Sequence, residues 1–308
     1  MSPKGQKRKR EKGEMGSGKR FVLYSLLPFY PYVIGWLPSG PSRYRSTHFK
    51  RGRLTIRRTD LVCSAALALF YATVASAQVP PKSIAVVHDV KPKVGADFDA
   101  AMKRHLEWHR QQKDTWALFT WEIISGERSG RYVVISFGHD WKDFDDRTKF
   151  QEADEANVRL TLAPVVDSVT DSYYLYRADL SVTMQDQTGP APYDEVITFF
   201  LKPDAWPPDM ENTIKKINEA AKKSNYPLHG EWYELLNGGE DAMVLAIPHK
   251  NWADFQPPDK GFVAMLNDAY GELLTRDLFG RFNRNVRAER SEIIRYRADL
   301  SYVPQPSQ

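Results

Sequence analysis

Runs of β-branched and aromatic residues alternate along the chain with segments in which apolar residues recur at helical spacing. The runs at 84–90 and 196–201 both stop at a Lys-Pro pair, which is typical of a strand that ends at a turn. Between 98 and 109, and again between 210 and 221, the apolar residues share one helical face. The pattern therefore predicts a strand followed by an amphipathic helix in each half of the chain.

The same order of elements continues after each helix. Two apolar runs flank a glycine-bearing turn in both halves, as expected for a β-hairpin. A second helix follows, clearest over 262–274, and a last strand is expected at 172–180 and at 292–300. Each half thus has the order βαββαβ. The hairpin runs lie at 118–124, 132–137, 232–236 and 242–247.

Local similarity indicates that the halves are copies of one unit. Trp121 recurs as Trp232, at an offset of 232 − 121 = 111. The six residues Tyr-Arg-Ala-Asp-Leu-Ser close both copies, at 176–181 and 296–301, where the offset is 296 − 176 = 120. The second copy has therefore gained residues before its last strand.

An order of βαββαβ gives an antiparallel four-stranded sheet with both helices on one face. The other apolar face must be buried, and the second copy is the nearest partner. Burial of apolar surface contributes about 25 cal/mol per Å². We therefore expect an α+β protein in which two antiparallel sheets pack face to face and enclose a cavity.

This element order and repeat length resemble the dimeric α/β-barrel superfamily, in which ferredoxin-like units pair through their sheets. The resemblance covers 83–301, and the antibiotic-biosynthesis monooxygenase-like domains are its closest small members. It implies a pseudo-dimeric α/β barrel built from tandem repeats. The superfamily includes cofactor-free oxygenases, haem-binding enzymes and non-enzymatic ligand binders, and it shares no catalytic signature, so no residue role is carried over.

The segment 57–77 has the features of a secretory signal peptide. Arg57 and Arg58 precede an apolar run, and small residues end at Ala77, after which we expect cleavage. Export to the periplasm or the extracellular space, without a stable membrane span after cleavage, is the predicted localisation. The chain divides into a disordered or non-native leader (1–56), the signal peptide (57–77), the first ferredoxin-like repeat (78–183), a linker (184–192), the second repeat (193–303) and a tail (304–308).

Charge and cysteine content exclude several functions. The excess of basic residues lies in the leader, so the folded part lacks the basic footprint of a nucleic-acid-binding protein. Cys63 is the only cysteine and lies before the expected cleavage point, which rules out disulfides, thiolate catalysis and cysteine-ligated metals in the mature chain. Phosphate-binding loops and the common hydrolase motifs are also absent from the sequence.

His105 and His109 are the strongest candidates for a metal or haem site, because a spacing of four places two imidazoles on one helix face. His88 is the only histidine that suggests itself as a third ligand. The second copy has Ile217 and Ala221 at the matching positions. The alternative is that both histidines are structural, and because that helix face should pack on its own sheet, we predict no cofactor and keep haem or a metal as the alternative.

Arginines and tryptophans at matched positions are the other candidates. Arg177 and Arg297 either line the cavity as anion clamps or, as we favour, form ion pairs that lock the copies together. Trp121 and Trp232 are core anchors that also give the cavity an aromatic lining. His139 and His249 differ by 110, which is one residue out of register, so we assign them no role.

The sequence therefore predicts an exported protein that binds a small apolar molecule between two pseudo-symmetric sheets. Self-association remains open. The alternative is an oxygenase-like or haem-binding enzyme, which requires a polar, titratable group facing the cavity. The sequence does not decide whether the protein is an enzyme.

Overall fold

The computed structural model describes residues 82–184 and 188–304. The predicted leader and signal peptide lie outside the described residues. Among the described helices, none combines the length and the apolar character needed to cross a bilayer.

The first unit contains β1 (Ile84–Pro92), α1 (Phe98–Gln112), β2 (Phe119–Ile123), β3 (Tyr132–His139), α2 (Trp141–Asp146), α3 (Thr148–Thr161) and β4 (Val166–Tyr176). The second unit contains β5 (Tyr193–Leu201), α4 (Pro207–Ser224), β6 (Glu231–Asn237), β7 (Ala242–His249), a 3₁₀ turn η2 (Trp252–Phe255), α5 (Phe262–Tyr270), α6 (Glu272–Asn285), β8 (Val286–Tyr296) and a 3₁₀ turn η3 (Ala298–Leu300).

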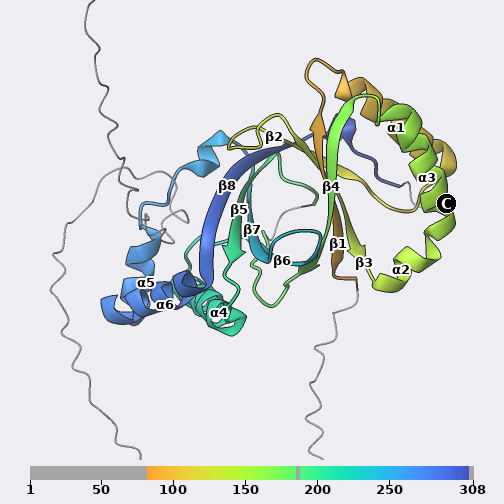
Figure 1. Ribbon diagram of the computed structural model, residues 1–308. Coiled ribbons are helices and arrows are strands. Elements are labelled where there is room, and N and C mark those ends of the chain that lie inside the picture. The colour runs from red at the N-terminus through yellow and green to blue at the C-terminus, as the bar shows by residue number, and fades with distance from the viewer. Residues whose placement is uncertain (1–81, 185–187, 305–308) are drawn as a thin grey trace, which may run out of the picture. The chain divides into compact units, whose positions relative to one another are not determined.

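The eight strands form one closed antiparallel barrel in the order β1-β3-β2-β8-β5-β7-β6-β4 (Figure 1). Each unit contributes a sheet with the ferredoxin-like order, and the sheets join at two seams, where β2 pairs with β8 and β4 pairs with β6. The predicted fold class, a pseudo-dimeric α/β barrel of two tandem units, is confirmed. Hydrogen-bonded seams leave no open sheet edge, which is how barrels avoid edge-to-edge association.

The helices cover the outside of the barrel in two separate layers. In Figure 1, α1, α2 and α3 lie on one side of the barrel, and α4, α5 and α6 lie on the other. Leu106 and Phe282 are almost completely buried in the two helix-facing cores. A further cluster around Ile123 and Ile294 contains strand residues of both units and no helix residue, so it fills the barrel interior. Alternation along each strand separates these inner and outer cores.

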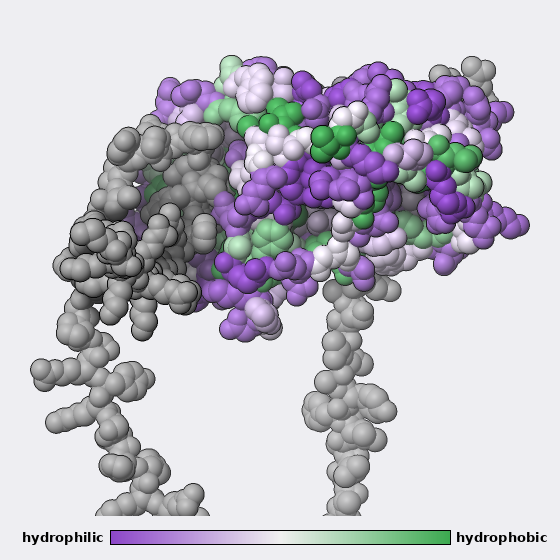
Figure 2. Space-filling view, turned by 45° about the horizontal axis from the view of Figure 1, so that its top comes forward, coloured by the Kyte–Doolittle hydropathy of each residue, from purple (hydrophilic) through white to green (hydrophobic). Residues whose placement is uncertain are grey.

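The surface is mainly polar on the face that Figure 2 shows. Hydrophobic residues appear there as small separate areas between hydrophilic ones. Isolated apolar side chains of this kind are normal on a protein surface.

The repeated closing segments do not continue the last strands, as we had expected. β4 ends at Tyr176 and β8 ends at Tyr296. Beyond them the chain turns, with the backbone N–H of Leu180 and that of Leu300 each donating to the carbonyl of the arginine three positions earlier. The turn buries both leucines completely. The prediction of strand up to 180 and 300 was therefore wrong, because the helix-facing core takes up the leucine of each repeat.

The second helix of the second copy is divided in two. Gly271 has φ +77 and separates α5 from α6. This is a conformation that glycine adopts without steric cost. The last strands also begin earlier than expected, at Val166 and Val286.

At β2 and β6, the structure aligns the two copies one residue away from the alignment that the sequence suggested. The N–H of Arg177 donates to the carbonyl of Trp232, and the N–H of Arg297 donates to the carbonyl of Thr120, both at 2.8 Å. Thr120, not Trp121, is therefore the counterpart of Trp232. Because neighbouring strand residues point to opposite faces, Trp121 faces the barrel interior while Trp232 faces the helices.

Candidate functional site

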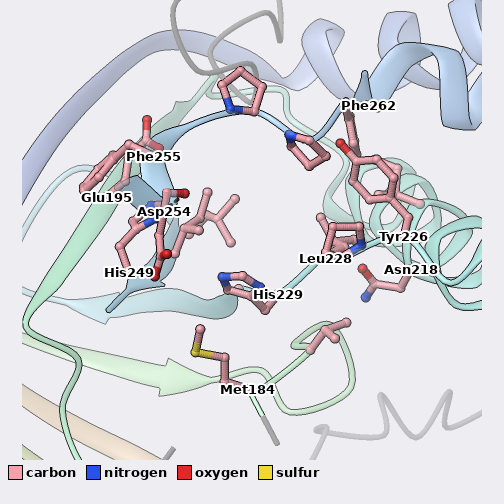
Figure 3. A pocket seen from close by; sticks show the side chains of 18 of the residues that line it. Met184, Glu195, Asn218, Tyr226, Leu228, His229, His249, Asp254, Phe255 and Phe262 are labelled. Atoms are coloured by element: carbon pink, nitrogen blue, oxygen red, sulfur yellow. Dashed lines mark hydrogen bonds between the residues drawn. The ribbon is translucent and has the colours of Figure 1, made fainter. Parts of the chain in front are cut away.

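A cavity of about 520 Å³ lies between the sheet and the helices of the second unit, and we call it the helix–sheet pocket. Its walls come from α4, β6, β7 and the segments that follow α4 and β7. Figure 3 shows Glu195, Asp254 and His249 on one side of the pocket and Tyr226, Leu228 and Phe262 on the other. The described lining is mostly apolar, with polar groups such as Glu195 on one side and Asn218 on the other (Figure 3). This combination is characteristic of small-molecule sites.

The two copies differ at two positions in the lining of this pocket. Leu228 stands at the position that Trp116 occupies in the first unit, and Gly230 stands at the position of Leu118, because the bridge Val182↔Gly230 corresponds to the bridge Leu118↔Tyr302. In the first unit, the Trp116 ring stacks on His139 with centroids 3.6 Å apart. The second unit has smaller side chains at both positions, and both residues belong to the pocket lining.

His249 is the most distinctive polar group of the pocket. Its side chain is buried, and its Nδ1 lies 3.2 Å from the carbonyl oxygen of Asp254, so Nδ1 carries the proton that is donated. Its Nε2 is buried without a hydrogen-bond partner among the described residues. Burial lowers the pKa of His249, so the ring is neutral and Nε2 offers an unused lone pair.

The corresponding histidine of the first unit is satisfied. His139 of β3 pairs with Ile84 of β1, and His249 of β7 pairs with Tyr193 of β5. The two histidines therefore lie at matched positions. The sequence interpretation that they are out of register was wrong, because a bulge in β1–β3 pairing absorbs the extra residue. The Nε2 of His139 lies 2.8 Å from the hydroxyl of Ser136, which supplies the missing donor.

Glu195 adds an acid to the pocket. It lies on β5 opposite Ile247, and the hydroxyl of Ser291 lies 3.5 Å from its Oε1. Burial raises the pKa of Glu195, because a charged carboxylate is costly where water is excluded. The pocket therefore contains a neutral base and an acid with a raised pKa, His249 and Glu195.

A second, smaller cavity of about 290 Å³ lies at one end of the barrel interior, and we call it the barrel-mouth cavity. Phe119, Trp121 and Tyr233 line it together with the linker segment Gly189–Ala191. The indole Nε1 of Trp121 donates to Oδ2 of Asp194 at 3.0 Å, and burial raises the pKa of Asp194 to about 7. This cavity lies between the two sheets, where we had expected the ligand.

The expected cavity between the sheets is therefore present, but it is smaller than the helix–sheet pocket. Inward side chains fill most of the barrel: aromatic residues gather near one end, and an ion-pair network occupies another part of the interior. In that network Arg128 contacts both Asp89 and Glu292, and Arg131 lies 2.8 Å from Asp89. Pairing of this kind is what allows charged groups to be buried.

The predicted arginines lie at the seams of the barrel. Arg177 contacts Asp179 at 2.9 Å and reaches Glu234 of the second unit at 2.9 Å. Arg297 contacts Asp299 at 2.9 Å and Glu122 of the first unit at 3.2 Å. Neither arginine belongs to the described lining of the two cavities. The geometry matches the interface ion pairs rather than the anion clamps.

The predicted histidines lie in the helix layer of the first unit. His105 and His109 are both buried, and their Nε2 atoms are 3.0 Å apart. His88 does not join them, because its Nδ1 contacts Asp171 at 2.7 Å. The third group beside the pair is Asp154 of α3, which no sequence pattern indicated. Of the tryptophans, Trp121 lines the barrel-mouth cavity and Trp232 lines the helix–sheet pocket.

Haem held by two histidine ligands does not fit the pair His105 and His109. Two axial imidazole nitrogens must be roughly 4 Å apart, since each metal–nitrogen bond is about 2 Å, whereas the Nε2 atoms of His105 and His109 are closer and Asp154 stands beside them. In the helix–sheet pocket, haem would bring two anionic propionates. The described lining offers Lys250 as its only lysine and contains no arginine.

Comparison with known proteins adds a likeness of fold. No protein-family model matches the chain, and no curated protein matches it. A candidate monooxygenase of Lactobacillus acidophilus NCFM superposes with TM-score 0.45 and 8% identity, over 72% of this chain and 97% of that chain. An anthrone oxidase-like protein gives TM-score 0.44 and 10% identity, over 71% and 93%. A variant chlorite dismutase from Candidatus Nitrospira defluvii gives TM-score 0.45 and 10% identity, over 71% and 93%.

At such low identity the likeness concerns the fold alone, and the fold itself is established by the strand order of the closed barrel. Function must be argued from the pocket and its side chains.

Proposed function

We propose that the second unit binds a small, largely apolar molecule in the helix–sheet pocket, and that this molecule donates a hydrogen bond to Nε2 of His249. The observation that carries the proposal is a cavity of about 520 Å³ whose lining includes His249, an imidazole with an Nε2 atom that has no hydrogen-bond partner among the described residues. Small-molecule sites typically have volumes of about 300–1,000 Å³ and a few polar groups that orient the ligand.

The energetics favour a ligand with one hydroxyl or N–H group. A buried acceptor that lacks a partner costs about 1–3 kcal/mol, which a donor on the ligand would recover. Apolar contacts with Leu228, Phe262 and Ile217 would supply the remaining affinity, at about 25 cal/mol per Å² of surface removed from water.

A matched pair of probes tests this proposal. We expect 1-naphthol to bind more tightly than naphthalene, because only 1-naphthol can donate a hydrogen bond to His249. In His249→Phe the preference for 1-naphthol should disappear, a loss of about tenfold for a bond of about 1.4 kcal/mol. Binding is measured by the quenching of naphthalene fluorescence or by calorimetry.

A second variant tests the role of the pocket volume separately from the role of His249. Leu228→Trp restores the tryptophan of the first unit, so it should fill the pocket and weaken both probes. Leu273→Ala, at an exposed position outside the pocket lining, is the control and should leave both affinities unchanged. Equal affinities for all variants, together with no retained small molecule in native mass spectrometry, would contradict the proposal.

An enzyme is the second candidate, and the two titratable groups of the pocket favour it. A neutral His249 can accept a proton from a bound hydroxyl, and Glu195 can hold one, which is the arrangement that general acid–base catalysis requires. Oxygen uptake in the presence of phenolic compounds would reveal an oxygenase-like activity of this kind. Binding of the probes without any turnover would leave the protein a ligand binder.

We also propose that the protein is exported, with cleavage after Ala77. The support is the arrangement of a basic pair, an apolar run and small residues over 57–77, together with a mature sequence that has no cysteine. The mass of the mature protein from its own host tests this directly. A mature chain that begins before Gln78 would overturn the proposal.

A further inference from the structure

Three potential ligand atoms converge between α1 and α3 of the first unit. The Nε2 atoms of His105 and His109 are 3.0 Å apart. Oδ1 of Asp154 lies 3.5 Å from the first and 3.4 Å from the second. Both imidazoles are buried, and Oδ1 of Asp154 is buried without a hydrogen-bond partner among the described residues.

The outer nitrogens of the two rings determine which tautomers are present. Nδ1 of His109 lies 2.8 Å from Oδ2 of Asp114, a carboxylate that can only accept. Nδ1 of His105 lies 2.9 Å from Oδ1 of Asn157. Each Nδ1 therefore carries the proton, and each Nε2 presents a lone pair to the space that it shares with Asp154.

Three acceptors that face one another repel unless a cation lies between them. A proton on one imidazole would satisfy a single contact, and the contacts of 3.4 and 3.5 Å to Asp154 are long for hydrogen bonds. A metal ion would satisfy all three atoms at once. Two histidines with one carboxylate form a common ligand set for divalent zinc and iron.

The separations agree with direct coordination. Metal bonds of about 2.0–2.2 Å to nitrogen and oxygen place ligand atoms about 2.9 Å apart at right angles and about 3.4 Å apart at tetrahedral angles. The three observed separations, 3.0, 3.4 and 3.5 Å, fall in this range. Little movement would be needed to close the three atoms around an ion.

The groups around the two histidines orient the rings in the way that groups around a metal site orient its ligands. Asp114 holds His109 and is itself fixed by Arg147, whose Nη2 lies 2.7 Å from it. A carboxylate that fixes the far nitrogen of a histidine ligand orients the ring and strengthens its basicity. The rings of Trp108 and Phe150 pack beside His109 and limit access of water.

The second unit provides an internal comparison. There Ile217 and Ala221 stand at the positions of His105 and His109, and they pack with Phe262 and Leu266 in an apolar cluster that joins α4 to α5. In the first unit α3 contains no fully buried residue. Apolar burial therefore holds the helices together in one copy, and the polar cluster takes its place in the other.

We propose that His105, His109 and Asp154 bind a divalent transition-metal ion, for which zinc is the reference, and that this ion fastens α3 to α1. The site is distinct from the helix–sheet pocket and does not depend on its ligand. Asp114 and Asn157 are positioning residues that fix the two rings. A water molecule or the second oxygen of Asp154 would complete the coordination.

Metal titration of the full chain tests the proposal. After treatment with a chelator, the protein is titrated with Zn²⁺ by calorimetry and with Co²⁺ by visible absorption, which reports low coordination number. We expect one ion per chain, with affinity at least 100-fold weaker in Asp154→Asn and about 10–100-fold weaker in Asp114→Asn. His88→Gln, which changes an exposed histidine outside the cluster, is the matched control.

A double variant guards against simple misfolding. His105→Ile with His109→Ala copies the residues of the second unit, so it should keep the native circular dichroism while losing the metal and the rise in melting temperature that Zn²⁺ produces. If the wild-type chain binds no more Zn²⁺ than this variant, the cluster is only a hydrogen-bonded network and the proposal fails. Binding that Asp154→Asn does not weaken would place the metal elsewhere and would also overturn it.

Discussion

Asp194 should destabilise the folded protein at neutral and alkaline pH. Its carboxyl group lies at the barrel-mouth cavity, where Trp121 is its hydrogen-bond donor at 3.0 Å and burial raises its pKa to about 7. Asp194→Asn keeps the shape and an oxygen that accepts from the indole, but it cannot ionise. The substitution therefore isolates the cost of the charge.

The size and sign of the effect follow from the two pKa values. Below the unfolded value of 3.8, both states are protonated and the charge costs nothing. As the pH rises from there to about 7, the unfolded chain releases its proton while the folded one retains it, so stability falls. The full difference corresponds to about 4 kcal/mol, and because the side chain keeps some contact with solvent we expect about 2–4 kcal/mol.

Urea unfolding of both proteins at several pH values measures this difference. Asp194→Asn should be nearly neutral at pH 4 and should stabilise the protein by about 2–4 kcal/mol at pH 8. Asp299→Asn is the control of opposite sign, because its hydrogen bond from Arg297 lowers the pKa of Asp299, and the variant should lose stability at pH 8. A pH-independent difference for Asp194→Asn would refute the reasoning.

Further substitutions test the packing and the buried ion pairs. Leu106→Ala, in the fully buried core beside α1, should cost about 2–5 kcal/mol in urea unfolding. Gly238→Ala should cost more than about 1 kcal/mol, since φ is +95 and its Cβ would meet backbone atoms, whereas Gly280→Ala in open space within α6 should stabilise by about 0.5–1 kcal/mol. Arg128→Met should cost about 3–5 kcal/mol because it leaves Glu292 buried without its main partner, and adding Glu292→Gln should recover most of that loss.

The order of elements and the barrel were predictable because both depend on coarse patterns. The spacing of apolar residues distinguishes strands from helices, and two copies of a sheet with an uncovered apolar face must pair. The orientation of single side chains was less accessible. An error of one residue in aligning Trp121 with Trp232 exchanged the inner and outer faces of β6, because alternation has a period of two.

The chemistry of the candidate sites was only partly accessible from sequence. The spacing of His105 and His109 predicted that their imidazoles share one helix face, yet Asp154, which lies beside them, comes from another helix and no local pattern marks it. The raised pKa of Asp194 depends on burial at the barrel mouth, which a single strand sequence does not reveal. Long-range proximity and desolvation are properties of the fold rather than of the neighbouring residues.

The two copies have diverged on their helix-facing sides while their seams have kept the same contacts. Arg177 reaches Glu234 across one seam and Arg297 reaches Glu122 across the other, so the repeated closing segments serve the same role in both units. The helix layers differ: the first unit has Trp116 and a histidine cluster, and the second has Leu228, open space and apolar helix contacts. Because the barrel depends on the seams and the cores, each outer layer was free to acquire its own chemistry. This explains why the proposed metal site and the proposed ligand pocket lie in different units, and why restoring the tryptophan with Leu228→Trp should close the pocket without opening the barrel.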